Sequence, residues 1–437
     1  MPFSGMVYSG CDGTQGGGMM EAAAMSRVNR RLLPFLFLLY VVCFIDRTNV
    51  SFAALQMNRD LGLSDAVYGL GAGVFFLGYA VFEVPSNLIL ARVGARRWIG
   101  RIAISWGVLA MGMLFVRSGT SFLVMRFLLG VAEAGYFPGI IYYLSLWFPE
   151  RHLARATSRL MIGIPLASAI GGPVGGLLLG LDGTLGLAGW QWLFLLEGVP
   201  AVILGVIALR YLTDRVSEAT WLPEQERAWL RDTLETERLA AQRRAHTRLS
   251  EIFRSGKVGL LTLIYFLFAV ILYGLTLWLP LMIRDDLGLG NVGVGLVIGL
   301  LGVCGAAAML LNSRHSDRTG ERALHSAVPI AISATAVAIG AIIGAGPVTI
   351  VTLGAAIVAL NAMGPTFWCL PRTVLQGTAA AGGIALINAV GNLGGFAGPN
   401  VLGVIKQATG TYSVALFILA AGGFVAAGLL LRFRGTS

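Results

Sequence analysis

The chain contains 437 residues, of which 56% are hydrophobic and only 12% are charged. Soluble globular proteins carry about 25% charged residues, so this composition excludes a soluble protein and indicates that most of the chain lies in lipid. A net charge of +10 raises the question of nucleic-acid binding, which the positions of the basic residues answer below. The four cysteines are scattered without metal-ligand spacing, so we expect no disulfide framework, no metal site and no cofactor.

The first 26 residues are rich in glycine and weakly polar, and no basic region leads into an apolar core. This pattern differs from that of a secretory signal peptide. We expect residues 1–26 to form a disordered tail, with Met19, Met20 and Met25 as alternative starts of the chain.

Twelve apolar runs follow, each of about 20 residues or more and long enough for a transmembrane helix. A charged segment at residues 213–256 separates the sixth run from the seventh, and we expect a solvated, partly helical connector there. It divides the chain into an N-terminal half (27–212) and a C-terminal half (257–437). The predicted fold class is an all-α polytopic membrane protein, with spans at 31–53, 66–90, 97–116, 120–148, 157–180, 190–212, 258–283, 290–312, 323–344, 347–371, 377–405 and 410–432.

The basic residues of the loops predict the orientation of these spans. Loops on one side of the predicted membrane carry sixteen arginines, whereas the other side has only Arg59, Arg117, Arg284 and Lys406. Cytoplasmic loops are enriched in Lys and Arg, so we expect both termini in the cytoplasm and the protein in the inner membrane. This distribution also accounts for the positive charge without nucleic-acid binding.

Two features repeat between the halves. Glycine-rich stretches occupy the fifth span (165–176) and the eleventh span (388–399), and the basic loop at 92–97 is echoed at 317–322. Two equivalent six-helix halves with a solute site between them are typical of secondary transporters.

Five further motifs follow in order: DRTN at 46–49, FEVPSN at 82–87, RFLLGVAEAG at 126–135, WQWLFLLEG at 190–198 and GIALIN at 383–388. With the two basic loops they resemble the major facilitator superfamily, and within it the anion:cation symporter branch of tartrate, sugar-acid and aromatic-acid permeases. The first loop departs from the family pattern, because Ala91 stands where an acidic residue is usual. The resemblance implies proton coupling at Asp46 and Glu133 and substrate contacts at Tyr79, Trp368 and Asn388.

Four charged residues lie at membrane depth in the N-terminal half. Asp46 and Arg47 stand roughly 22 Å along the first span, and Glu133 lies near the middle of the fourth span. Buried carboxylates can take up protons, whereas arginine keeps its charge. Arg126 shares a helical face with Glu133 and lies two turns nearer the outside, where it would receive an arriving carboxylate or restrain Asp46 in a structural ion pair.

Other polar residues have less certain roles in the sequence. Glu83 lies near the cytoplasmic end of the second span, where an interhelical or gating contact is expected, and Glu197 is expected to be a structural partner. Tyr79 can donate to a carboxylate. The C-terminal half has no clear charge within a span, and its candidates remain open: Trp368 as solute wall or membrane packing, and Asn388 as solute contact or interhelical hydrogen bond.

The favoured function is proton-coupled uptake (symport) of a small organic carboxylate such as tartrate by a monomer. Arg47 and Arg126 would hold the anion, while Asp46 and Glu133 carry protons. Alternatives are a sugar-acid (galactonate- or glucarate-like) symporter, an aromatic-acid (phthalate- or hydroxyphenylacetate-like) symporter, and a drug/proton antiporter. Apolar side chains at 161, 162 and 164 favour a less hydroxylated acid. An enzyme is not expected, since no nucleophile–base set lies at membrane depth.

Overall fold

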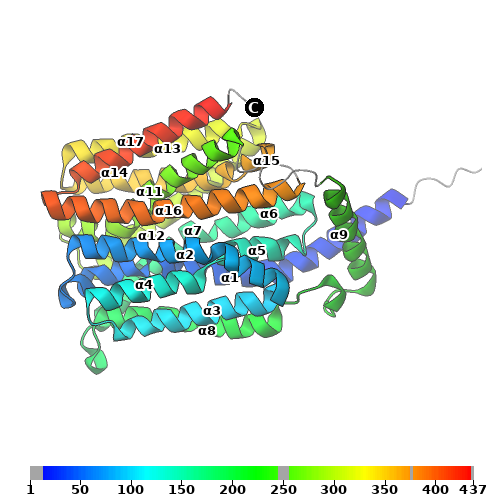
Figure 1. The fold of residues 1–437 in the computed structure, drawn as a ribbon, viewed down its shortest axis with the longest axis horizontal. Coiled ribbons are helices and arrows are strands. Elements are labelled where there is room, and N and C mark those ends of the chain that lie inside the picture. Colours follow the sequence, from blue (N-terminus) through cyan, green and yellow to red (C-terminus); the bar gives the residue numbers. More distant parts are fainter. Residues whose placement is uncertain (1–12, 245–254, 375–376, 435–437) are drawn as a thin grey trace, which may run out of the picture.

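The computed structural model describes residues 13–244, 255–374 and 377–434, almost all of them in helices that run side by side along one bundle (Figure 1). The N-terminal half consists of α1 (Gly13–Asp60), α2 (Asp65–Val93), α3 (Ala95–Gly112), α4 (Gly119–Glu133), α5 (Tyr136–Ser145), α6 (Glu150–Met161), α7 (Gly163–Leu178) and α8 (Gly189–Tyr211).

Helix α9 (Glu224–Arg244) crosses one end of the bundle and lies in the segment where a connector was predicted. The C-terminal half then repeats the arrangement with α11 (Gly256–Leu287), α12 (Asn291–Thr319), α13 (Arg322–Ile343), α14 (Pro347–Phe367), the short α15 (Pro371–Val374), α16 (Gly377–Thr409) and α17 (Ser413–Arg434).

Eleven helical stretches of the described residues are long and apolar enough to cross a membrane. Helix α16 is a twelfth long helix, of 33 residues. It packs lengthwise between α2 and α11, so it belongs to the same bundle. The all-α polytopic membrane class predicted from the sequence is confirmed.

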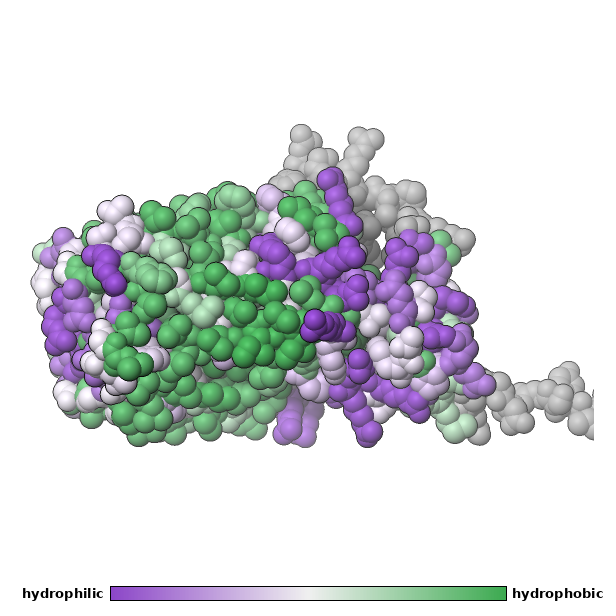
Figure 2. Space-filling model, turned by 90° about the horizontal axis from the view of Figure 1, so that it is seen from below, coloured by the Kyte–Doolittle hydropathy of each residue, from purple (hydrophilic) through white to green (hydrophobic). Residues whose placement is uncertain are grey.

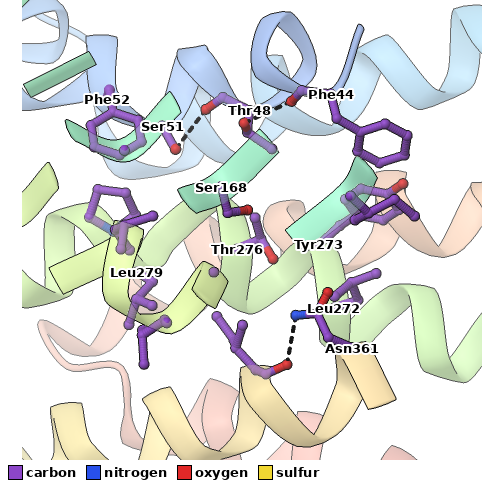
Figure 3. Close-up of a pocket in the computed structure, with 17 residues that line it drawn as sticks. Phe44, Thr48, Ser51, Phe52, Ser168, Leu272, Tyr273, Thr276, Leu279 and Asn361 are labelled. Atoms are coloured by element: carbon purple, nitrogen blue, oxygen red, sulfur yellow. Dashed lines mark hydrogen bonds between the residues drawn. The ribbon is translucent and has the colours of Figure 1, made fainter. Parts of the chain in front are cut away.

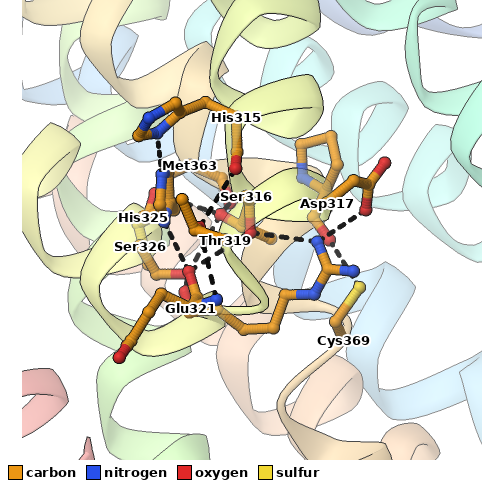
Figure 4. Close-up of polar contacts among 12 residues, drawn as sticks. His315, Ser316, Asp317, Thr319, Glu321, His325, Ser326, Met363 and Cys369 are labelled. Carbon is orange, nitrogen blue, oxygen red and sulfur yellow. Dashed lines mark hydrogen bonds and ion pairs between the residues drawn. The ribbon is translucent and has the colours of Figure 1, made fainter.

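Figure 2 shows the surface that such a protein needs. On this face hydrophobic side chains cover the centre, and hydrophilic side chains gather at the two ends, more of them at the end that carries α9. The beginning of α1 and the end of α17 lie at that same end (Figure 1). The basic loop at 317–322, the second copy of the predicted repeat, lies at this end as well. An ion pair of 2.7 Å between Arg322 Nη1 and Asp317 Oδ1 closes it (Figure 4).

The prediction of a disordered tail at residues 1–26 requires a correction for residues 13–26, whereas residues 1–12 lie outside the described part of the chain. Helix α1 already begins at Gly13, so residues 13–26 are helical and continue directly into the first span. The stretch from Met19 to Met25 contains alanine, methionine and glutamate, which are strong helix formers. In addition, Glu21 pairs with Arg151 at 2.6 Å and with His152 at 2.7 Å, which ties this extension to α6.

The predicted fourth span is also not one continuous helix. Helix α4 starts at a capping box formed by Ser118 and Ser121 and stops at Glu133. Gly135 then has a φ of 79°, in the left-handed region that favours glycine, before α5 begins. The carbonyl of Ala134 is satisfied by the Ser86 hydroxyl of α2 at 2.6 Å. The chain therefore breaks directly after the carboxylate that the sequence placed at the centre of the span.

The two halves meet along two glycine-lined seams, one between α7 and α12 and the other between α2 and α16. A Cβ built on Gly172 would lie 2.6 Å from the Gly295 carbonyl oxygen, and one built on Gly403 would lie 2.4 Å from that of Asp65. Backbones approach this closely only where small residues face each other. The glycine-rich fifth and eleventh spans are thus the surfaces through which the halves touch.

Candidate functional site

A cavity of about 70 Å³ lies between the halves, within the bundle. Four of the predicted substrate residues line it together: Arg47 and Tyr79 from the N-terminal half, and Trp368 and Asn388 from the C-terminal half. Water requires roughly 10–15 Å³, so several water molecules or a small solute fit. The wall is largely aromatic, with Tyr40, Phe44, Phe137, Tyr265, Phe268 and Tyr273 among its residues.

Arg47 is the charged group of this cavity. It forms a buried ion pair with Glu133, to which the Cys43 thiol also donates at 3.1 Å. The guanidinium carbon of Arg47 lies 5.2 Å from the ring centre of Tyr79 and 4.9 Å from that of Phe44. The break after α4 leaves Glu133 at a helix end that faces α1. A carboxylate and a permanent cation are therefore in direct contact at the edge of the cavity.

Asp46 points elsewhere, as expected for neighbours that are about 100° apart on a helix. It accepts hydrogen bonds from the Trp106 indole of α3 at 2.7 Å and from Asn49 at 3.3 Å. It is 1% exposed and does not line the cavity. Within the described residues it has no ion-pair partner. Asp46 is thus a buried carboxylate held by neutral donors.

Arg126 is fully buried against α2. Its Nε donates to the Gly71 carbonyl at 3.2 Å and its Nη2 to that of Ala72 at 3.4 Å, while Nη1 has no hydrogen-bond partner in the described part of the chain. The alternative of an ion pair with Asp46 is wrong, since each residue bonds to other groups. In this conformation Arg126 also lies outside the cavity. The face shared by Arg126 and Glu133 in the sequence serves two different neighbours.

A polar contact joins the halves at the cavity wall. The Asn388 amide of α16 donates to the Glu83 carboxylate of α2 at 2.7 Å, and both side chains are buried. This is the interhelical contact expected of Glu83. It gives Asn388 the interhelical hydrogen bond of its two alternatives, and because Asn388 also lines the cavity, a solute contact stays a prediction. Trp368 follows the end of α14 and packs edge-on against Tyr265 at 4.9 Å. It is a wall of the cavity rather than a lipid-facing ring.

Two contributors were absent from the sequence analysis. Cys43 lies one helical turn before Arg47 on the same face of α1, so the spacing of four residues could have indicated its contact with Glu133. Trp106 approaches Asp46 from α3, 60 positions along the chain. No local pattern signals such a contact.

Buried charges beside a solute cavity between two equivalent halves define a membrane transporter rather than an enzyme. Residues 36–399 match the family model described as Major Facilitator Superfamily. The chain belongs to this superfamily.

Several known proteins are similar to the chain. One from Agrobacterium vitis, named "Putative tartrate transporter", is 47% identical over 408 residues, which cover 92% of each chain. One from Acinetobacter baumannii, named "Quinolone resistance transporter", is 39% identical over 399 residues, covering 91% of this chain and 92% of that protein. The crystal structure of a bacterial homologue of the human lysosomal transporter Spinster matches with a TM-score of 0.74 at 18% identity, covering 93% of this chain and 97% of that one. At that identity it supports the fold alone.

Proposed function

We propose that this protein takes up a small organic carboxylate anion, such as tartrate, together with protons by alternating access. The observation that carries the proposal is the buried ion pair between Arg47 and Glu133 at the cavity edge. The name of the Agrobacterium vitis relative supports tartrate as the first solute to test.

The ion pair supplies a coupling rule. While Glu133 is ionised it occupies Arg47, and a solute carboxylate would have to displace a buried charge. Removing a partner from a buried charge costs about 3–5 kcal/mol, so the anion binds favourably only when Glu133 carries a proton. On the other side of the membrane, loss of that proton restores the ion pair and expels the anion. Proton and anion therefore move together.

Asp46 is the second proposed proton site. Its two neutral donors bond to the carboxyl oxygens without neutralising the charge, and no cation among the described contacts holds it ionised. Charges in membrane spans that lack a partner are costly, which favours a bound proton during part of the cycle. Arg126 lies between Glu133 and the end of the bundle away from α9. We propose that it receives the anion when the bundle opens at this end away from α9. Its free Nη1 leaves one donor for this role.

Tyr79, Trp368 and Asn388 are proposed to recognise the rest of the solute. The orientation proposed from the basic loops puts α9 and both termini in the cytoplasm. We further propose that the protein lies in the inner membrane and acts as a monomer. A sugar-acid symporter would use the same charges.

The aromatic wall of the cavity favours a second candidate, an aromatic-acid symporter. The name of the Acinetobacter baumannii relative keeps a drug/proton antiporter as a further alternative. Counterflow separates these candidates. Tartrate, galactonate, phthalate and a quinolone should be offered to protein in liposomes, with exchange of the true solute expected to exceed the others.

The Glu133→Gln variant tests coupling. Glutamine cannot ionise, so this variant should lose uphill accumulation driven by a pH gradient while it retains solute counterflow. Uphill uptake at the wild-type level by Glu133→Gln would remove Glu133 from the coupling role. The Glu226→Gln variant provides the matched control, because Glu226 is a buried carboxylate of α9 that pairs with Arg27 at 3.5 Å and does not line the cavity.

A further inference from the structure

A second cavity, of about 60 Å³, adjoins the first one. It lies among α1, α7, α11, α12 and α14, so both halves contribute to it (Figure 3). The two spaces adjoin, because five residues line both of them: Phe44, Ile164, Leu272, Tyr273 and Asn361. We refer to this second space as the hydroxyl chamber, because of the four side chains described next.

Four serine and threonine side chains line the chamber, in addition to Tyr273: Thr48 and Ser51 of α1, Ser168 of α7 and Thr276 of α11. No charged residue lines it. The remainder of the wall is apolar, with Phe52, Leu279 and Ile298 among its members. Groups that both donate and accept hydrogen bonds, such as the hydroxyl groups of a solute, fit such a lining.

Two of these hydroxyl groups are free. Serine and threonine within a helix commonly donate to a carbonyl one turn earlier, and Thr48 does so, to Phe44 at 2.9 Å. Ser168 and Thr276 make no hydrogen bond with the described residues. Figure 3 shows both hydroxyl groups near the middle of the chamber, between Thr48 and Asn361. Unused hydroxyl groups that point into a cavity from opposite halves are suited to a ligand.

The remaining polar atoms add acceptors. Ser51 donates to the Thr48 carbonyl at 2.7 Å, and the Asn361 amide nitrogen donates to that of Ile357 at 2.9 Å. The oxygen lone pairs of both side chains remain available to the chamber. Ser51 is also four residues beyond Arg47 on α1, which corresponds to about 6 Å along the helix. A short acid bound at Arg47 can therefore extend its chain into this space.

We propose that the hydroxyl chamber binds the hydroxyl-bearing carbons of the solute while its carboxylate is held at Arg47. The protein then selects hydroxy acids over acids of the same length without hydroxyl groups. This inference rests on the proposed transport of an organic carboxylate. It also revises the expectation drawn from the apolar positions 161, 162 and 164, because the polar group of this helix lies one turn later, at Ser168.

Competition between matched acids tests the chamber. Tartrate and succinate are four-carbon diacids that differ only in two hydroxyl groups, and galactonate and hexanoate form a longer pair. Each acid should be tested as a competitor in counterflow assays. The assays use the wild-type protein, the single variants Ser168→Ala and Thr276→Val, and the double variant. Losing one hydrogen bond costs about 1 kcal/mol, so we expect tartrate affinity to fall about fivefold in each single variant and more in the double variant. Succinate affinity should not change.

The matched control is Thr335→Val, which removes an exposed hydroxyl group that bonds only to Ala331 of its own helix at 2.9 Å. It should leave both affinities as in wild type. An equal loss for tartrate and succinate, or no loss for either, would overturn the chamber while leaving carboxylate transport intact. A wild-type protein that exchanges no carboxylate at all would instead overturn the proposed function and the chamber with it.

Discussion

The two halves share an architecture but differ in how they treat charge. Every Asp, Glu, Lys or Arg of the described spans that is at most 7% exposed belongs to the N-terminal half: Asp46, Arg47, Glu83, Arg126, Glu133 and Glu197. The equally buried polar residues of the C-terminal half are neutral: Ser316, Ser326, Ser333, Thr349, Thr366, Asn388 and Asn392.

This difference separates two tasks. A charge in a membrane span is costly and is usually paired or hydrogen-bonded, so under the proposed function the loss of a charge in the N-terminal half should have a large effect. Neutral amides and hydroxyl groups contribute about 1 kcal/mol each, so the C-terminal half can adjust which solute fits. Substitutions should therefore abolish transport in the first half and change selectivity in the second.

Arg47 should give the largest effect. Truncation to alanine removes the cation of the cavity and leaves Glu133 buried alone, so Arg47→Ala should destabilise the protein and reduce tartrate uptake by about 100-fold or more. The Arg47→Ala/Glu133→Gln double variant removes both charges. We expect it to regain thermal stability without regaining tartrate binding, as measured by melting temperature with and without tartrate.

Arg47→Lys completes this series. Lysine keeps the charge but lacks the planar fork of arginine, so its uptake should stay well below the wild-type rate. If the double variant binds tartrate as wild type does, Arg47 is a structural partner of Glu133 and the anion site lies elsewhere.

Asn388 tests the neutral half with an intermediate effect. Its amide contacts Glu83 and also lines the cavity, so two roles must be separated. We expect Asn388→Ala to raise the KM for tartrate by about tenfold, because the variant loses one buried hydrogen bond and leaves a buried acceptor unpaired. The same rise should appear in a Glu83→Gln background. If the rise vanishes there, Asn388 acts only by positioning Glu83.

The sequence predicted much of this division because charge and glycine are visible in a single chain. Apolar runs of spanning length predicted the helical class, and the charges within them identified Arg47. The family resemblance added Tyr79, Trp368 and Asn388, and the structure brings these four residues to one cavity. Periodicity also placed Arg126 and Glu133 on one helical face.

Contacts between distant segments could not be predicted in this way. The break at Gly135 depends on the hydrogen bond that Ser86 of α2 supplies to Ala134. The pairing of Arg126 with two backbone carbonyls depends on how closely α2 approaches α4. The hydroxyl chamber is the clearest case, since Ser168 and Thr276 are more than 100 positions apart and are each unremarkable among the hydroxyl groups of apolar helices.

Lys406 should give the smallest effect, because it joins the halves outside the cavity. At the end of the bundle away from α9, its ammonium lies 3.3 Å from Asp65 of the N-terminal half and 3.6 Å from Asp285 of its own half. Partly exposed ion pairs contribute about 0.2–1 kcal/mol. Lys406→Gln should therefore change the rate of tartrate exchange by less than about fivefold, by making this end of the bundle easier to open.

Salt distinguishes this role from a local one. Exposed charges are screened at high ionic strength, so wild type and Lys406→Gln should differ at low KCl and converge at high KCl. Arg59→Gln is the matched control, because Arg59 lies at the same end and pairs only with its neighbour Asp60 at 3.4 Å. A rate difference that persists at high KCl would mean that Lys406 acts through packing against Trp278 and Tyr412, whose ring centres lie 5.4 and 4.4 Å away. The Lys406 side chain would then stabilise the C-terminal half itself rather than its contact with the N-terminal half.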